Sequence, residues 1–158
     1  NKGLEYLVEA YKKIETNKKL VIVGDGDFLE QLKEKAENNK NIIFTRTQVG
    51  DTLAELFSNA ALFVQASEAE GLSISLLEAM SAKLPLLVSS IDANKEVVEN
   101  NALIFENKNV EDLKNKLEIF LNHKNDLGID KMIENSYNGL LVEYNWEKIT
   151  GNIINLYK

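Results

Sequence analysis

Cysteine is absent from this sequence of 158 residues, and proline, histidine and tryptophan occur once each. The lack of cysteine excludes disulfides and thiolate metal sites, and it is compatible with a reducing compartment. No apolar run approaches the roughly 18 residues that a membrane span needs, and the first residues lack a secretory signal pattern. We therefore expect a cytoplasmic domain, with any contact to the cytoplasmic membrane face made through a part of the protein outside this chain.

Positive charge is also scarce, because 18 Lys and Arg stand against 25 Asp and Glu, for a formal charge of -7. This balance disfavours a broad surface that follows the phosphates of nucleic acid or of acidic lipid. A bound anion must therefore be held by local donors. The length and the 44% hydrophobic content suit one core, so we interpret residues 1–158 as a single domain.

The apolar pattern alternates between helical spacing and short continuous runs. The continuous runs predict strands at 19–23, 42–44, 61–65, 86–88 and 102–105. Helical spacing predicts helices at 4–14, 28–36, 53–57 and 76–80, a short helical turn at 96–98, and three further helices at 110–121, 129–141 and 146–157. The alternation predicts an α/β fold: a doubly wound, Rossmann-like parallel sheet of about five strands, helices on both faces, and a C-terminal helical tail.

The most informative segment, residues 70–80, places two carboxylates around a short loop. Glu70 precedes the loop, and Glu78 lies in the predicted helix that follows it. The segment comes after the run 61–65, at the carboxyl end of a strand, where open α/β sheets bind ligands. The N–H groups of such a loop and helix N-terminus favour an anion. Two acceptors beside an anion cradle suit a sugar attached to a phosphate.

The same residues admit a structural interpretation. The spacing of Ser75 and Glu78 fits a capping box, in which Ser75 caps the helix and Glu78 reaches back to a free N–H. Glu70 would then be a solvated loop charge, as carboxylates commonly are.

Other candidates carry less information. Gly24 and Gly26 lie between a predicted strand and helix, where they suit either a phosphate or a tight turn, and Leu29 occupies the third glycine position of a dinucleotide fingerprint. His123, at the end of a predicted helix, suits a cap that complements the helix dipole. Trp146 and Tyr157 have the spacing of packing residues.

Five segments, taken in order, resemble the C-terminal, donor-binding domain of the retaining GT-B glycosyltransferases of family 4. They are Lys2 to Ala10 (K-G-x-x-x-L-x-x-A), 20–26 (a strand with G-x-G), 70–80 (E-G-F-G-x-x-x-x-E-A-M, with its E-x7-E spacing), 85–89 and 94–98 (N-x-E-V-V). The resemblance runs through almost the whole chain and implies one half of a GT-B fold, a fragment that lacks the N-terminal acceptor domain.

The resemblance also implies roles for individual residues. Glu70 would approach the donor sugar's hydroxyls as the catalytic-site glutamate, and Glu78 would accept hydrogen bonds from the ribose. The remaining donor-binding positions would be the loop and helix-terminal residues that hold the diphosphate, with Lys2 adding positive charge, and the residues near the base: Gly71, Leu72, Ser73, Ile74, Lys2, Gly24, Gly26 and Arg46.

The implied activity is that of a retaining hexosyltransferase that uses a UDP-, GDP- or ADP-sugar and an acceptor such as a glycan or a lipid. Neither a metal nor a cofactor is expected, because fixed dipoles and basic side chains stabilise the departing diphosphate. We expect the isolated domain to bind the donor nucleotide without transferring sugar.

The sequence departs from the family pattern at three places: Leu72-Ser73 for Phe-Gly, Lys83 for a glycine, and Asp92-Ala93 for Gly-Gly. These departures leave open a degenerate domain with a structural or regulatory role. A nicotinamide-dependent oxidoreductase is a second alternative, disfavoured by the missing third glycine.

Overall fold

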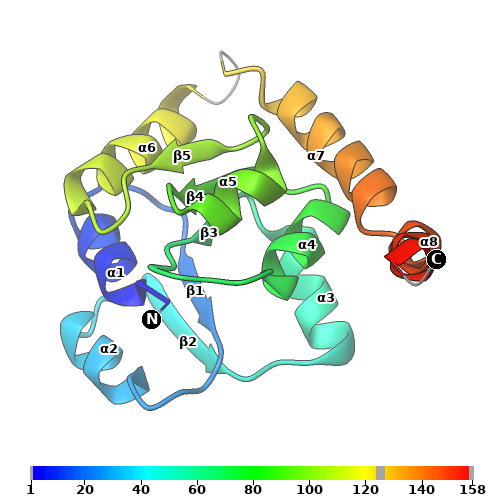
Figure 1. Ribbon diagram of the computed structural model, residues 1–158. Coiled ribbons are helices and arrows are strands. Elements are labelled where there is room, and N and C mark those ends of the chain that lie inside the picture. The colour runs from blue at the N-terminus through cyan, green and yellow to red at the C-terminus, as the bar shows by residue number, and fades with distance from the viewer. Residues whose placement is uncertain (1, 124–126, 157–158) are drawn as a thin grey trace.

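The computed structural model describes residues 2–123 and 127–156, in which five parallel strands are surrounded by helices (Figure 1). The strands are β1 (Leu20–Val23), β2 (Ile42–Arg46), β3 (Phe63–Gln65), β4 (Leu86–Ser89) and β5 (Leu103–Phe105). Within these residues the hydrogen-bonded ladders fall into two groups, β1–β2 and β3–β4–β5. All pairings are parallel, as the sequence predicts.

The helices are α1 (Leu4–Lys12), α2 (Leu29–Lys35), α3 (Gly50–Asn59), α4 (Ile74–Ser81), α5 (Asp92–Val98), α6 (Val110–His123), α7 (Ile129–Glu143) and α8 (Trp146–Leu156). The expected turn at 96–98 is therefore the end of a short helix. His123 is the last residue of α6, where the sequence places it.

Strand β4 shows why helices lie on both faces of the sheet. Its side chains alternate, and all four of its residues are buried. Leu87 packs in a cluster with α1 and α6, whereas Leu86 and Val88 pack in another with α4 and α5. The two layers lie on opposite sides of this strand in Figure 1. The doubly wound arrangement is thus confirmed, and it aligns the ends of β3 and β4 at one edge.

Helix α4 ends in a Schellman turn with Lys83 in its left-handed position. The Lys83 amide donates to Met80 O, the Leu84 amide donates to Ala79 O, and Lys83 has φ +55°. Glycine is the usual residue there because it lacks the Cβ that crowds this conformation. The Lys83 Nζ also lies 4.4 Å from the centroid of the Tyr137 ring in α7. This cation–π contact offsets part of the backbone strain.

We expect Lys83→Gly to leave the free energy of unfolding within about 0.5 kcal/mol of wild type, because a relief of about 1 kcal/mol is opposed by a similar cation–π loss. In a Tyr137→Leu background the cation–π contact is already gone, so the same substitution should stabilise by about 1 kcal/mol. Urea unfolding of the four proteins measures both values. Equal effects in the two backgrounds would show that the ring contact contributes nothing.

The C-terminal tail differs from the expectation that its aromatic residues are packed. Trp146 is 80% exposed, and Ile153 and Ile154 are also exposed, because α8 extends beyond the sheet and chiefly meets α7. Tyr157 lies outside the described residues. None of the helices in the described part of the chain is both long and apolar enough to cross a bilayer.

Candidate functional site

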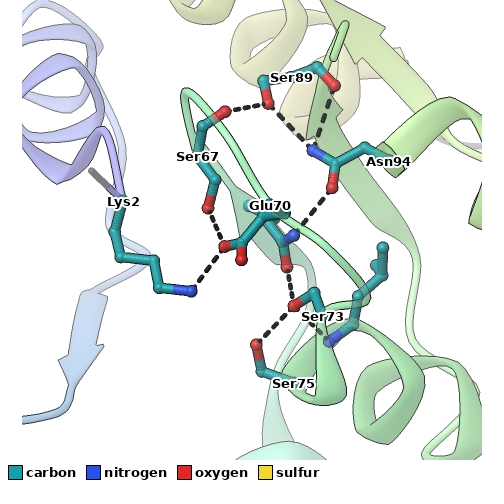
Figure 2. Close-up of polar contacts among 9 residues, drawn as sticks. Lys2, Ser67, Glu70, Ser73, Ser75, Ser89 and Asn94 are labelled. Atoms are coloured by element: carbon teal, nitrogen blue, oxygen red, sulfur yellow. Dashed lines mark hydrogen bonds and ion pairs between the residues drawn. The ribbon is translucent and has the colours of Figure 1, made fainter. Parts of the chain in front are cut away.

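The candidate site forms where the loop after β3 meets the start of α1. Gly3 caps α1 with φ +62°, and a Cβ built on it would lie 2.0 Å from the carbonyl oxygen of Ala66. Only glycine permits this approach of two backbones. The approach sets Lys2 beside the loop that carries Glu70 (Figure 2).

Lys2 and Glu70 form an ion pair at this junction. The Lys2 Nζ donates to Glu70 Oε1 at 2.5 Å, and the Ser67 hydroxyl donates to the same oxygen at 2.7 Å. The Glu70 side chain is 13% exposed, whereas that of Lys2 is 66% exposed. Glu70 Oε2 accepts no hydrogen bond from the residues that the structure describes. Glu70 is therefore a fixed, largely buried carboxylate rather than a freely solvated charge.

Two opposing effects set the ionisation of Glu70. Burial raises the pKa of its carboxyl group, but the hydrogen bonds from Lys2 and Ser67 together outweigh burial, so the pKa lies below its ordinary value. A depressed carboxyl pKa contributes stability above the unfolded-state pKa, and that contribution is lost as the pH falls through the folded-state pKa. Glu70 is thus ionised at neutral pH.

We expect Lys2→Ala to raise the pKa of Glu70, because burial then opposes ionisation without the hydrogen bond and the positive charge of Lys2. Titration of the Glu70 carboxyl carbon by NMR in wild type and variant measures the shift. Lys116→Ala, which removes a lysine from α6, is the control and should leave that titration unchanged. A Glu70 titration that is the same in Lys2→Ala and wild type would mean that the ion pair does not persist in solution.

The N-terminus of α4 corrects the capping-box interpretation. The N-cap is Ser73, whose hydroxyl accepts from the Leu76 amide at 3.4 Å, so Ser75 lies inside the helix at its second position. Glu78, the fifth residue of α4, is exposed and too far along to reach the N-cap amide. The first two helical amides, of Ile74 and Ser75, have no intrahelical acceptor. The side chains of Leu72 and Ile74 beside them are exposed.

A buried polar network, which the sequence did not reveal, connects these parts (Figure 2). Gln65, at the end of β3, bonds to Ser73 and to Asn94 of α5, both at 2.8 Å. Asn94 donates to the carbonyl and hydroxyl oxygens of Ser89, and the Ser89 hydroxyl donates to Ser67 O at 2.6 Å. A polar residue closing an otherwise apolar strand was the available signal for Gln65. The segments that resemble the family include Ser73, Ser89 and Asn94, whereas Gln65 and Ser67 lie outside them.

A second ion pair lies next to the first. Lys108 Nζ lies 2.8 Å from Glu68 Oε2, and the Tyr6 hydroxyl donates to Glu68 Oε1 at 3.2 Å. The hydrogen bond from Lys108 lowers the pKa of the Glu68 carboxyl group. The Asn107 side chain donates to Glu68 O at 3.4 Å. The loop after β5 thus contacts the loop that carries Glu70 through Lys108 and Asn107, which both bond to Glu68.

The remaining predicted residues lie at the ends of β1 and β2. Gly24 has φ +138° and donates its amide to Arg46 O at 2.9 Å, so its turn requires glycine, whereas Gly26 has no positive φ. Arg46 Nη1 lies 3.9 Å from Asp25 Oδ2, a loose pair in which Arg46 is 68% exposed. The structure therefore brings Gly24 and Arg46 together in a group separate from the Glu70 network.

Asp92 and Gly71 occupy exposed positions. Asp92 begins α5 and pairs with Lys95 at 2.9 Å, which lowers the pKa of its carboxyl group. Gly71 has open space where a Cβ would stand. Among the described residues, no group of three or more His, Cys, Asp or Glu side chains is arranged to hold a metal ion.

Comparison with known proteins identifies the family to which the chain is similar. Residues 1–139 match the family described as Glycosyl transferases group 1. An uncharacterized glycosyltransferase of Methanocaldococcus jannaschii, MJ1607, is 32% identical over 165 residues, which cover 99% of this chain and 42% of that protein. The chain spans less than half the length of the first curated relatives that it matches.

Solved structures share the fold. The HepE protein of Anabaena, in complex with UDP and glucose, superposes with a TM-score of 0.86 at 17% identity over 99% of this chain and 44% of that one. The catalytic domain of a cholesterol-α-glucosyltransferase from Helicobacter pylori superposes with a TM-score of 0.77 at 22% identity, covering 91% of each chain. These neighbours are GT-B glycosyltransferase domains, so the expected fold is confirmed.

Proposed function

The chain belongs to the group 1 glycosyl transferases, and we propose that it binds the nucleoside-diphosphate sugar from which the whole enzyme transfers a hexose. One observation carries the proposal: the fixed carboxylate of Glu70 lies in the loop that leads from the carboxyl end of β3 to α4, whose first two amides, of Ile74 and Ser75, have no intrahelical acceptor. A carboxylate that accepts hydrogen bonds, close to backbone N–H groups that can donate them, suits a ligand in which sugar hydroxyls adjoin a diphosphate.

The proposal assigns a role to each site residue. The diphosphate lies against the amides of residues 71–74 at the start of α4, where the helix dipole favours negative charge. Lys2 leaves Glu70 in part to pair with the diphosphate, which frees Glu70 Oε1 for a sugar hydroxyl.

Glu78, exposed on α4, accepts a hydrogen bond from the ribose. The base lies toward Gly24, Gly26 and Arg46. UDP is the first nucleotide to test because the neighbour HepE was solved with it, and GDP and ADP are the alternatives.

The transfer itself needs more than this chain supplies. The bond between the anomeric carbon and the diphosphate oxygen breaks, the acceptor hydroxyl oxygen bonds to that carbon, and the hydroxyl proton passes to the departing diphosphate oxygen. Retention of configuration, family 4 membership and the E-x7-E role of Glu70 and Glu78 are parts of the proposal. So is an acceptor domain in the remainder of a longer protein, which this chain alone cannot replace in transfer. Leaving-group charge is stabilised by the α4 amides and Lys2, without a metal.

A degenerate donor site is the second candidate, favoured by the carboxylate of Asp92 at the start of α5, on the sheet edge that carries Glu70. A negative charge there opposes a diphosphate if it faces the same cleft. Asp92→Gly restores the family residue and should then strengthen diphosphate binding.

Calorimetric titration with UDP, GDP and ADP tests the proposal, with NADH as the control for the oxidoreductase alternative. We expect one nucleoside diphosphate to bind and its affinity to fall with salt, because Lys2 and the α4 amides supply local positive charge to a chain of net charge -7. Lys2→Ala should weaken binding and flatten the salt dependence, whereas Lys116→Ala should do neither. Absence of binding to all three nucleotides at millimolar concentration would refute donor binding and leave the degenerate domain.

A further inference from the structure

The buried amides of Gln65 and Asn94 lie between the two halves of the proposed donor site. Gln65 is 5% exposed and Asn94 is 1% exposed, and both use their side-chain groups entirely within the protein. Buried amide side chains that merely fill space are rare, because each unsatisfied polar atom destabilises the fold. The pair therefore needs an explanation beyond packing.

The direction of every hydrogen bond in the network follows from one backbone carbonyl. Ser89 O can only accept, so the atom of Asn94 that faces it, at 3.2 Å, must be the Nδ2 donor. Asn94 Oδ1 then faces Gln65 and must accept from Gln65 Nε2, at 2.8 Å. That orientation leaves Gln65 Oε1 to accept the Ser73 hydroxyl proton, also at 2.8 Å.

The first arm of the network ends at the start of α4. Because Ser73 gives its single proton to Gln65, its lone pairs are left to accept from the Leu76 amide at 3.4 Å and from Ser75 at 3.1 Å. The N-cap of α4 is thereby held in place from within the sheet. The amides proposed for the diphosphate take their position from this cap.

The second arm ends at Glu70. Asn94 Nδ2 also donates to the Ser89 hydroxyl at 3.0 Å, so that hydroxyl must give its own proton elsewhere. It donates to Ser67 O at 2.6 Å, and the Ser67 hydroxyl in turn donates to Glu70 Oε1 at 2.7 Å. The backbone and side chain of Ser67 thus tie Glu70 to the same asparagine (Figure 2).

We propose that Gln65 and Asn94 are positioning residues that fix Glu70 and the α4 N-terminus relative to each other, so that one nucleotide-sugar molecule contacts both. The inference rests on the proposed donor site. Neither residue touches the donor. Each acts through a serine, Ser73 on one arm and Ser67 on the other, and loss of either amide should disturb both arms together.

Gln65→Glu tests the proposal in a single variant, because protonation of the new carboxyl group at low pH should restore the hydrogen bonds that its ionised form loses. In its ionised form, favoured at high pH, the new carboxylate can accept from Ser73 but cannot donate to Asn94 Oδ1, so two acceptors face each other. The neutral carboxylic acid supplies both functions, as glutamine does, and burial favours this form. We expect UDP affinity about tenfold below wild type at pH 8, recovering toward the wild-type value as the pH is lowered to 5.

Deletion of a single hydroxyl group tests each arm of the network by itself. Ser73→Ala should reduce affinity for UDP, and Ser67→Ala should reduce only the additional affinity of UDP-glucose over UDP. Asn94→Asp should reduce both. Leu32→Ala, a cavity variant on α2 in a different core cluster, controls for lost stability and should change neither.

NMR of the free protein decides the inference independently of any nucleotide. In Gln65→Glu at pH 8, the amide signals of residues 67–70 and of residues 73–76 should both shift, and the Leu76 amide should exchange faster than in Leu32→Ala. Both groups of signals should return toward wild type at pH 5. If no nucleotide binds but the signals behave in this way, the donor proposal fails and the coupling stands. Shifts confined to one arm, or none, would overturn the positioning role even if UDP binds normally.

Discussion

Gly3→Ala should destabilise the protein by about 3 kcal/mol or more, a loss that combines a left-handed backbone penalty with overpacking against a backbone. The added Cβ would lie 2.0 Å from Ala66 O and 2.9 Å from Ala66 C, neither of which is a flexible side-chain end. Either α1 or the loop after β3 must move. Urea unfolding gives the stability change, and the Glu70 titration shows whether Lys2 has left its partner.

Gly128→Ala is the matched control for this substitution. Gly128 caps α7 as Gly3 caps α1, with φ +63° against +62°, but it has open space where the Cβ would stand. It should lose only the backbone penalty of about 1 to 2 kcal/mol. The difference between the two variants isolates the close approach to Ala66. Equal losses would show that the junction relaxes freely and does not fix Lys2.

Glu78→Ala should weaken binding of both UDP and UDP-glucose by about 1 to 3 kcal/mol, or roughly 5- to 150-fold, because a ribose hydroxyl loses its acceptor. Glu70→Ala should retain UDP affinity, since it releases Lys2 for the diphosphate, and should remove the affinity that the sugar adds. Calorimetry with both ligands on the chain, and turnover in the full-length protein, measure these effects.

Two outcomes would contradict this division of roles. Equal losses of UDP affinity in the two variants would mean that Glu70 and Glu78 contact the same part of the ligand. A loss of stability in Glu78→Ala without a loss of binding would assign Glu78 to the helix rather than to the ribose. Glu78→Gln, which keeps an acceptor oxygen, should retain most of the affinity.

The sequence predicted the order and type of the elements because continuous apolar runs such as 86–88 and the helical spacing of 4–14 report burial directly. It also placed Glu70 and Glu78 correctly, after β3 and within α4. Lys83, which stands in place of a glycine of the family pattern, has the left-handed backbone that glycine commonly adopts. These are local properties, determined by neighbours along the chain.

The sequence failed where long-range contacts decide the structure. Ser75 and Glu78 have capping-box spacing, but the contact from Gln65 makes Ser73 the cap instead. Trp146 has the spacing of a packed residue, yet the tail extends past the sheet that would bury it. The Ser89 and Asn94 bonds join residues of different elements, so no spacing rule contains them. The ion pair of Lys2 and Glu70 was not predicted, although both residues were named.

The division of the strands into two ladders has a consequence for how the molecule comes apart. Residues 20–46 pair only with one another among the described strands. They are joined to α1 through apolar contacts with Ile22 and Ile42 and through side-chain hydrogen bonds and ion pairs, such as those of Lys12 with Lys35 O and Glu37. No backbone ladder joins this segment to the β3–β4–β5 sheet within the described residues, and parts of a protein that lack such shared ladders can open as separate cooperative units. This segment should therefore behave as a separate opening unit that proteases cut first under native conditions, while the β3–β4–β5 sheet and the Glu70 network persist until global unfolding.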